Sequence, residues 1–196
     1  MTVLADKRSL LIIACLVWLF PLAGLIGCGG APEHPLSPQA RAFANHMNEK
    51  ITRFVPPLVE PAAKQDVKKL SAALSGLFQE AAQQGKPLTY SLYVLDDQAR
   101  PLAGHYFQPD KPAGVPDMEV KEQNYSNFKV ISEIMRKPKI IQSRIYLPGE
   151  VYYAIFVPLV QERKARGILA IFFTASVLQE QFKLSEKDFL AIDLNR

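Results

Sequence analysis

Two segments in the last third of this chain are almost continuously apolar, and they constrain its fold more than any other feature. They cover residues 151–160 and 168–173, and both are rich in the β-branched and aromatic residues that favour strands. A strand with one face in water alternates apolar and polar residues, which neither segment does. The two segments therefore predict a sheet whose central strands are covered on both faces by helices.

Apolar residues at helical spacing predict a long helical segment ahead of the sheet. The first helix should span residues 38–54, with Ser37 as its N-cap and Pro56-Pro57 beyond its end. Its apolar stripe consists of Phe43, Met47, Ile51 and Phe54. A second helix should cover residues 61–84 and end at Gly85.

The remainder of the chain predicts strands and one further helix. The strands should cover residues 88–95, 101–107, 139–147, 151–160 and 167–174. The helix should cover residues 119–137, after an irregular, proline-rich loop at 108–118. Arg163-Lys164-Ala165-Arg166 should form a hairpin turn. This order predicts an α+β domain on a five-stranded antiparallel sheet, with a long N-terminal helical segment and helices on both faces.

The first 28 residues have the layout of a secretory signal, in which an apolar run follows two cations. Leu25-Ile26-Gly27-Cys28 resembles the lipobox of bacterial lipoproteins. This resemblance implies cleavage before Cys28, acylation of its thiol by lipid such as palmitate, and attachment of the mature chain to a membrane. An uncleaved membrane anchor is the alternative. It is disfavoured because the apolar run contains Pro21 and is shorter than the roughly 20 residues that a spanning helix needs.

The same motif predicts how the chain is organised. Residues 1–27 should be the signal peptide, 28–37 a lipidated tether, and 38–196 one domain with its helices in 38–84 and its sheet in 88–196. In lipoproteins of this kind, an Asp after the lipidated cysteine favours retention in the inner membrane. Gly29 stands here instead, so the resemblance implies the periplasmic leaflet of the outer membrane.

Cysteine content and charge exclude several classes of protein. The cysteines are Cys15, in the predicted signal, and Cys28, whose thiol would carry lipid. The mature domain is therefore expected to hold no disulfide and no thiolate-bound metal. The formal charge is +4 for the whole chain, and removing Asp6, Lys7 and Arg8 lowers it by one. This excess is too small to predict a nucleic-acid-binding face.

The sequence does not predict catalysis. The histidines are His34, His46 and His105, and none has a partner at the spacing of a triad or a metal site, so each is expected to be solvated or at an edge. No glycine-rich phosphate loop follows a strand. Asp96-Asp97 occupies a turn, which favours Asp for conformational reasons. We therefore expect no enzymatic activity, no metal and no cofactor.

The hairpin around Pro148-Gly149 provides a candidate binding site. A two-residue loop there places Arg144 opposite Tyr153, so that Arg144, Tyr146 and Tyr153 share one face. A buried Arg needs an anionic partner, and its guanidinium group suits a carboxylate. The partner could be a ligand. Alternatively, Arg144 reaches the edge of the sheet or pairs with Glu150, and the tyrosines are ordinary strand residues.

The order of these elements resembles that of a known class of extracytoplasmic sensor, the single Cache domain, which is PAS-like. The resemblance rests on Tyr93-Val94-Leu95-Asp96-Asp97 after a long helix, on residues 151–160, and on residues 167–173, and it covers about residues 40–185. It implies a small-molecule pocket between the sheet and the helix-bearing connection at 125–136, which adds Tyr125 to the candidate ligand-binding residues.

These features predict a lipid-anchored periplasmic sensor module that binds a small metabolite. An organic anion is favoured by Arg144. Because the chain shows no kinase, cyclase or methyl-accepting segment, the signal is expected to pass through a partner protein in the envelope. The alternative is an envelope lipoprotein whose PAS-like domain only mediates protein–protein contacts. A cavity bounded by Arg144 and the tyrosines would distinguish the two.

Overall fold

The computed structural model of the chain describes residues 36–118, 125, 129–147 and 150–195. The predicted signal peptide, Cys28 with nearly all of its tether, Pro148-Gly149 and most of the segment 119–128 lie outside these residues. Within the described part of the chain, no helix is both long enough and apolar enough to cross a membrane.

Three described helices precede the sheet, where the sequence predicts two. α2 (Pro38–Phe54) has the predicted bounds, its predicted stripe is buried, and the Ser37 hydroxyl accepts a hydrogen bond from the amide of Ala40. α3 (Pro56–Ala63) begins at two prolines, which suit a first helical turn because its N–H groups have no partner within the helix. α4 (Val67–Gln83) follows. The single helix predicted over 61–84 is wrong, because Gln65 adopts a φ of 51° between α3 and α4.

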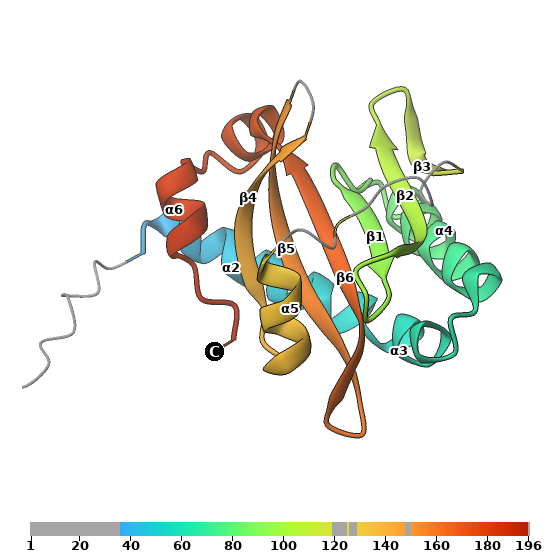
Figure 1. Ribbon diagram of the computed structural model, residues 1–196. Helices are drawn as coiled ribbons and strands as arrows, with labels where there is room; N and C mark the ends of the chain where they lie inside the picture. Colours follow the sequence, from blue (N-terminus) through green and yellow to red (C-terminus); the bar gives the residue numbers. More distant parts are fainter. Residues whose placement is uncertain (1–35, 119–124, 126–128, 148–149, 196) are drawn as a thin grey trace, which may run out of the picture. The chain divides into compact units, whose positions relative to one another are not determined.

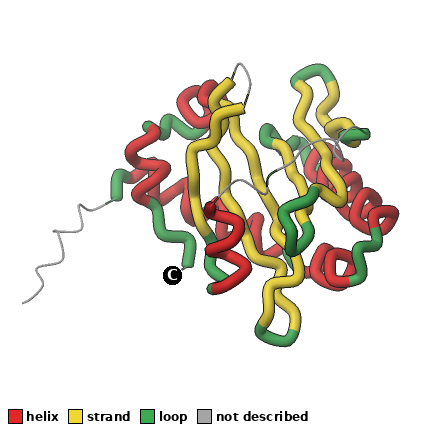
Figure 2. The backbone as a smooth tube through the Cα atoms, in the orientation of Figure 1, coloured by secondary structure: helices red, strands yellow, loops and turns green. Residues whose placement is uncertain are grey.

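The strands form one antiparallel sheet in the order β3-β2-β1-β6-β5-β4 (Figures 1 and 2). Their bounds are β1 (Ser91–Leu95), β2 (Pro101–Gln108), β3 (Lys111–Pro116), β4 (Ile141–Leu147), β5 (Glu150–Gln161) and β6 (Lys164–Thr174). β1 pairs with β6, for example through Leu92 and Ile171. This pairing joins the N-terminal strands to the C-terminal meander in one sheet.

The sixth strand, β3, lies in the segment predicted as an irregular loop. It pairs with β2 through His105 and Pro116 and through Tyr106 and Val115. Prolines lack an N–H and are disfavoured inside a sheet, which is why the sequence predicted a loop. β3 is an edge strand, where a residue without a donor is tolerated on the side that has no neighbour.

Two turns differ in detail from the sequence prediction. The β5–β6 turn lies at Glu162 and Arg163, which both have positive φ, and the rest of the basic stretch belongs to β6. In the β1–β2 turn, Ala99 has a φ of 63°, a backbone conformation that favours glycine. Asp96 stabilises this turn, since its carboxylate accepts hydrogen bonds from the amides of Gln98 and Arg100.

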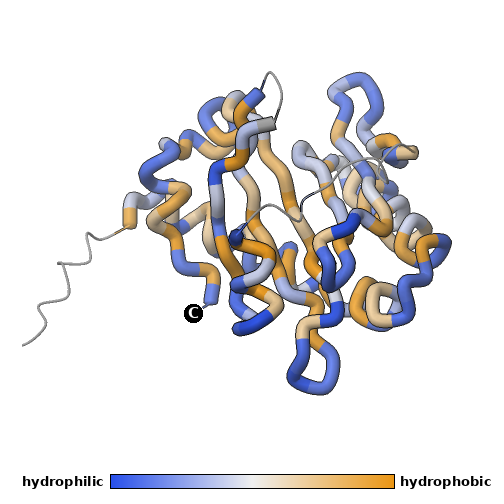
Figure 3. The backbone as a smooth tube through the Cα atoms, viewed as in Figure 1, coloured by the Kyte–Doolittle hydropathy of each residue, from blue (hydrophilic) through white to orange (hydrophobic). Residues whose placement is uncertain are grey.

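Helices cover both faces of the sheet, as predicted. One apolar layer, which includes Ile171 and Phe173, packs against α2, α3, α4, η3 (Val177–Gln181) and α6 (Glu186–Ala191). The other layer, which includes Phe156 and Phe172, packs against α5 (Lys129–Arg136). Figure 3 shows hydrophobic colour along the central strands and hydrophilic colour at the tip of the β5–β6 hairpin.

β5 extends beyond its neighbour β4. The last pair between them joins Ile141 to Phe156, so the following residues of β5 pair with β6 alone. Pro158 lies in this part of β5 and is paired with Ile168. The end of the β5–β6 hairpin projects from the rest of the sheet (Figure 2).

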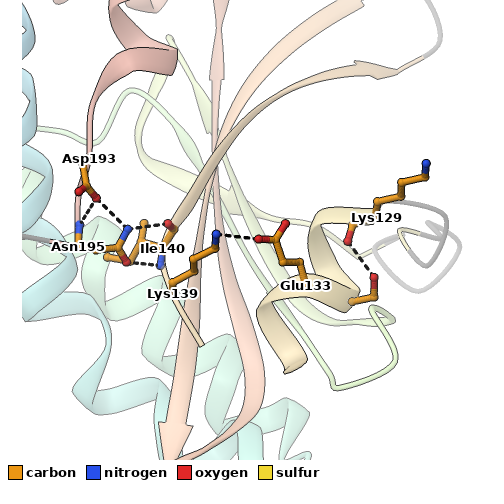
Figure 4. Close-up of polar contacts among 7 residues, drawn as sticks. Lys129, Glu133, Lys139, Ile140, Asp193 and Asn195 are labelled. Atoms are coloured by element: carbon orange, nitrogen blue, oxygen red, sulfur yellow. Dashed lines mark hydrogen bonds and ion pairs between the residues drawn. The ribbon is translucent and has the colours of Figure 1, made fainter. Parts of the chain in front are cut away.

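Two side chains fix the C-terminal segment to the start of β4. Nε2 of Gln142 donates to Ile192 O at 2.7 Å, and Asn195 bonds to the backbone of Ile140. The amide group of Asn195 accepts a hydrogen bond from Ile140 N at 2.7 Å and donates one to Ile140 O at 3.0 Å (Figure 4). Asn195 also donates to the carboxylate of Asp193, and nearby Lys139 forms an ion pair with Glu133 of α5. Asn195 thus satisfies the Ile140 backbone as a neighbouring strand would.

Candidate functional site

The β4–β5 hairpin has the predicted register. Arg144 pairs with Tyr153, and Tyr146 pairs with Val151. Alternation along the strands therefore places Arg144, Tyr146 and Tyr153 on one face of the sheet, as the sequence predicted.

The charge of Arg144 is compensated within the chain. Its Nη1 lies 2.5 Å from Oε1 of Glu186, at the start of α6, and the hydroxyl of Tyr153 donates to Oε2 of the same carboxylate at 3.0 Å. The guanidinium group lies 4.9 Å from the centre of the Tyr146 ring. The partner is therefore Glu186 rather than Glu150. No sequence pattern indicated it, because it comes from a helix whose docking depends on the whole fold.

A ligand-binding role for Arg144, Tyr146 and Tyr153 stays a prediction. The arginine side chain is 40% exposed, so a ligand would compete with Glu186 and with water for the guanidinium group. Tyr125 does not join this group. It belongs to the apolar layer under α5, on the opposite face of the sheet from Tyr153.

Tyr125 forms part of an aromatic cluster centred on Phe172 of β6. The centre of the Phe172 ring lies 5.5 Å from that of Tyr93, 6.0 Å from Tyr125, 6.3 Å from Tyr152 and 6.2 Å from Phe156. We call these five residues the Phe172 cluster. The rings come from β1, β5, β6 and the segment before α5, so the cluster lies across the middle of the sheet.

Two carboxylates meet the phenol groups of this cluster. Tyr93 is hydrogen-bonded to Asp117, and Tyr152 donates to Oε2 of Glu150 at 2.6 Å. Asp117 is held beside β2 by its own amide, which donates to Gly104 O at 3.0 Å. Gly104 must be a glycine for this arrangement, because a Cβ there would lie 2.5 Å from Cε1 of Tyr93.

The cluster keeps its phenols protonated. Burial raises the pKa of Tyr93, and the charge of Asp117 and the hydrogen bond to it add to the effect. Burial, followed by the Asp117 charge, raises the pKa of Tyr125 to about 12. Burial and the hydrogen bond to Glu150 raise that of Tyr152 to about 12. The site therefore presents neutral hydroxyl groups, aromatic rings and carboxylate oxygens.

The described histidines differ from the sequence prediction in one case. His105 is not at a solvated edge, since it is only 3% exposed. Its Nδ1 lies 3.4 Å from Oγ of Ser75, and its Nε2 lies 3.1 Å from the carbonyl oxygen of Ala113. Both ring nitrogens thus have partners. Through them His105, in β2, links the edge strand β3 to α4. Among the described residues, no group of three or more potential ligands could hold a metal ion.

No family model and no curated protein sequence matches the chain. Solved structures do. The extracellular domain of a protein classed as a histidine kinase, vpHK1S-Z8, aligns over 94% of this chain with a TM-score of 0.57 and 11% identity. A domain from a protein of the sensory box/GGDEF family of Vibrio parahaemolyticus aligns over 76%, with a TM-score of 0.50 and 14% identity.

The chain spans less than two thirds of the length of these two structures, 66% and 61% respectively. At such low identity the likeness concerns the fold and not the ligand. It agrees with the resemblance to Cache and PAS-like domains that the sequence provided, although the sheet has six strands rather than five. The described residues therefore have the fold of extracellular sensory domains.

Proposed function

We propose that this chain is a ligand-binding sensor module of the cell envelope and that the Phe172 cluster is its binding site. The sensory-domain fold supports the first part of the proposal. The second part is supported by the convergence of three phenols and two carboxylates on one face of the sheet. The observation that carries the choice of site is the contact of Tyr93 with Asp117 beside Phe172.

The chemistry of the cluster favours a ligand with a positively charged amino group. Cations are attracted to aromatic faces within about 6 Å, and carboxylates complete the charge balance. Asp117 and Glu150 supply those carboxylates, and the phenols orient them. An organic anion at Arg144 would instead have to displace Glu186. We therefore assign the amine to the α5 face and no ligand to the hairpin.

Membrane attachment and signalling form the rest of the proposal. Acylation of Cys28 would hold the module at the outer membrane, since two or three acyl chains give stable anchoring. Ligand occupancy would then pass to a partner protein in the envelope. We further propose that the module is not an enzyme, so that it releases its ligand unchanged.

A ligand screen with matched variants tests the site. The detergent-purified chain should be screened by thermal unfolding against primary and quaternary amines, and against carboxylic acids. A ligand of the folded state at a hundredfold excess over its Kd adds about 2.7 kcal/mol of stability. Asp117→Asn should weaken amine binding by about tenfold or more, because a charge-assisted hydrogen bond contributes about 1.5–3 kcal/mol.

Glu186→Gln is the matched control, since it makes the same change on the opposite face of the sheet. It should leave amine binding unchanged. Equal effects of the two variants would contradict the assignment of the site. Stabilisation by carboxylic acids that is lost in Arg144→Lys would return the site to the hairpin. If no compound binds, the alternative of a domain for protein–protein contacts is favoured, with the Phe172 cluster as a filled interior.

The lipid anchor has its own test. Cys28→Ser should abolish lipidation and signal cleavage, and mass spectrometry of the membrane fraction would show this directly. An unmodified Cys28, or an intact segment 1–27, in the native protein would contradict the proposed anchor.

A further inference from the structure

A pocket lies on the face of the sheet opposite the Phe172 cluster. It has a volume of about 390 Å³ and is formed by three segments that are distant in sequence. α2 contributes His46 and Lys50, the segment leading into β1 contributes Lys86, Thr89 and Tyr90, and the end of η3 contributes Gln181. The volume is within the usual range for small-molecule sites.

The charges around this pocket are predominantly positive. Lys50 and Lys86 both line it, and neither forms an ion pair with any carboxylate of the described residues. The pKa of His46 is lowered by burial first and then by the charges of both lysines. Glu49 is the one carboxylate that opposes them at His46. An excess of positive charge is therefore left at the pocket.

One buried polar group of the pocket lacks a partner within the described part of the chain, while others are paired. The hydroxyl of Thr89 donates to Oε1 of Gln181 at 2.6 Å, which fixes that amide. The Tyr90 hydroxyl is buried and has no hydrogen-bond partner among the described residues. Buried hydroxyl groups are rarely left unpaired in native proteins. An unpaired donor on a pocket-lining residue is an observation independent of the lysines.

The walls of the pocket contain apolar groups as well. Leu88 is buried beneath it, and the Phe182 ring lies 5.7 Å from the ring of His46. An inorganic ion would leave these groups without a contact, whereas an organic molecule would cover them.

We propose that this pocket binds a small organic anion, with its carboxylate or phosphate group between Lys50 and Lys86 and its apolar part against Phe182. The site is separate from the Phe172 cluster and does not depend on the function proposed for it. In the sequence, Arg144 is one candidate site for an organic anion. This pocket, unlike Arg144, has positive charge that no carboxylate of the described residues pairs with.

Calorimetric titration of the detergent-purified chain with benzoate, phenyl phosphate and inorganic phosphate tests the proposal. Benzoate or phenyl phosphate should bind with a measurable Kd, and inorganic phosphate should bind more weakly than phenyl phosphate. Comparison of the two organic probes identifies the preferred anionic group. Lys50→Gln and Lys86→Gln should each raise the Kd about tenfold.

Lys68→Gln is the matched control, because Lys68 is an exposed residue of α4 outside the pocket and its substitution changes the net charge equally. It should leave the Kd unchanged. Tyr90→Phe should weaken binding while leaving the unliganded protein as stable as before or more so, and Asp117→Asn should have no effect. The absence of saturable binding by both organic probes would overturn the proposal. So would equal effects of the three lysine variants, or equal binding of inorganic phosphate and phenyl phosphate.

Discussion

His105 connects the edge of the sheet to α4 through both nitrogens of its ring. With the proton on Nε2, the ring donates to Ala113 O and accepts from the Ser75 hydroxyl, and it packs against Phe78 with 4.4 Å between ring centres. This tautomer is inferred from the hydrogen-bond partners. Protonation would bury a charge and remove the acceptor that Ser75 uses. The native state therefore favours the neutral ring.

The protein should lose stability as the pH falls below about 6.5. Burial lowers the pKa of His105, although hydrogen bonds to the backbone of Ala113 and Gly114 oppose the shift. Over this range the unfolded imidazole, with a pKa near 6.5, takes up a proton before the folded one does, which favours unfolding. Above that pH both forms are neutral and the effect disappears.

Urea unfolding at pH 7.5 and pH 5.5 would measure this loss. His46 contributes with the same sign, because burial and then the charge of Lys50 lower its pKa. His46→Gln and His105→Gln should each reduce the difference between the two pH values. An unchanged difference in the double variant would show that other groups cause it.

At the scale of secondary-structure elements, local features could be predicted and long-range contacts could not. The bounds of α2 and the register of the β4–β5 hairpin depend on caps, spacing and turn length within a few residues. β3 was missed because its prolines are tolerated only at an edge, and edge position is a property of the whole sheet. The approach of Asp117 to Tyr93 depends on strand order in the same way.

The contribution of the C-terminal segment to stability can be measured at Asn195. Asn195→Ala should remove both hydrogen bonds to the backbone of Ile140, lowering stability by about 1 kcal/mol and accelerating hydrogen exchange at the Ile140 amide. Asp193→Asn is the matched control, because it changes a neighbouring side chain and leaves both bonds between Asn195 and Ile140 in place. Protection of the Ile140 amide should survive in Asp193→Asn. Equal exchange rates in the native protein and Asn195→Ala would show that the segment is not fixed there.

Phe172 carries the packing of the layer under α5. Phe172→Ala should cost about 3–5 kcal/mol in the free energy of unfolding, because the side chain is 5% exposed and touches several rings. Phe182→Ala, which removes a half-buried ring on the opposite face of the sheet, should cost less. Chemical denaturation would compare them. A loss below about 1 kcal/mol in Phe172→Ala would mean that this ring is not part of the core.

At the scale of the whole molecule, the described domain is stabilised by its two apolar layers without covalent cross-links. Both cysteines, Cys15 and Cys28, precede the described residues. Reducing agent should therefore leave the melting temperature unchanged, which calorimetry with and without a thiol reductant would show. A lower melting temperature under reducing conditions would indicate a disulfide, either within the chain or between chains.

The position of Pro158 in β5 affects whether two molecules of this protein can pair through their strands. Beyond Phe156, β5 pairs with β6 alone, and its other edge is free. A strand of a second molecule could pair with such an edge, as in domain swapping or fibril formation. A proline cannot donate a hydrogen bond, and it interrupts the row of groups that such pairing needs. The hairpin can therefore project into its surroundings with a reduced tendency to recruit other copies. This protection of the folded state against self-templated aggregation would matter most if the chain is attached to a membrane as proposed above.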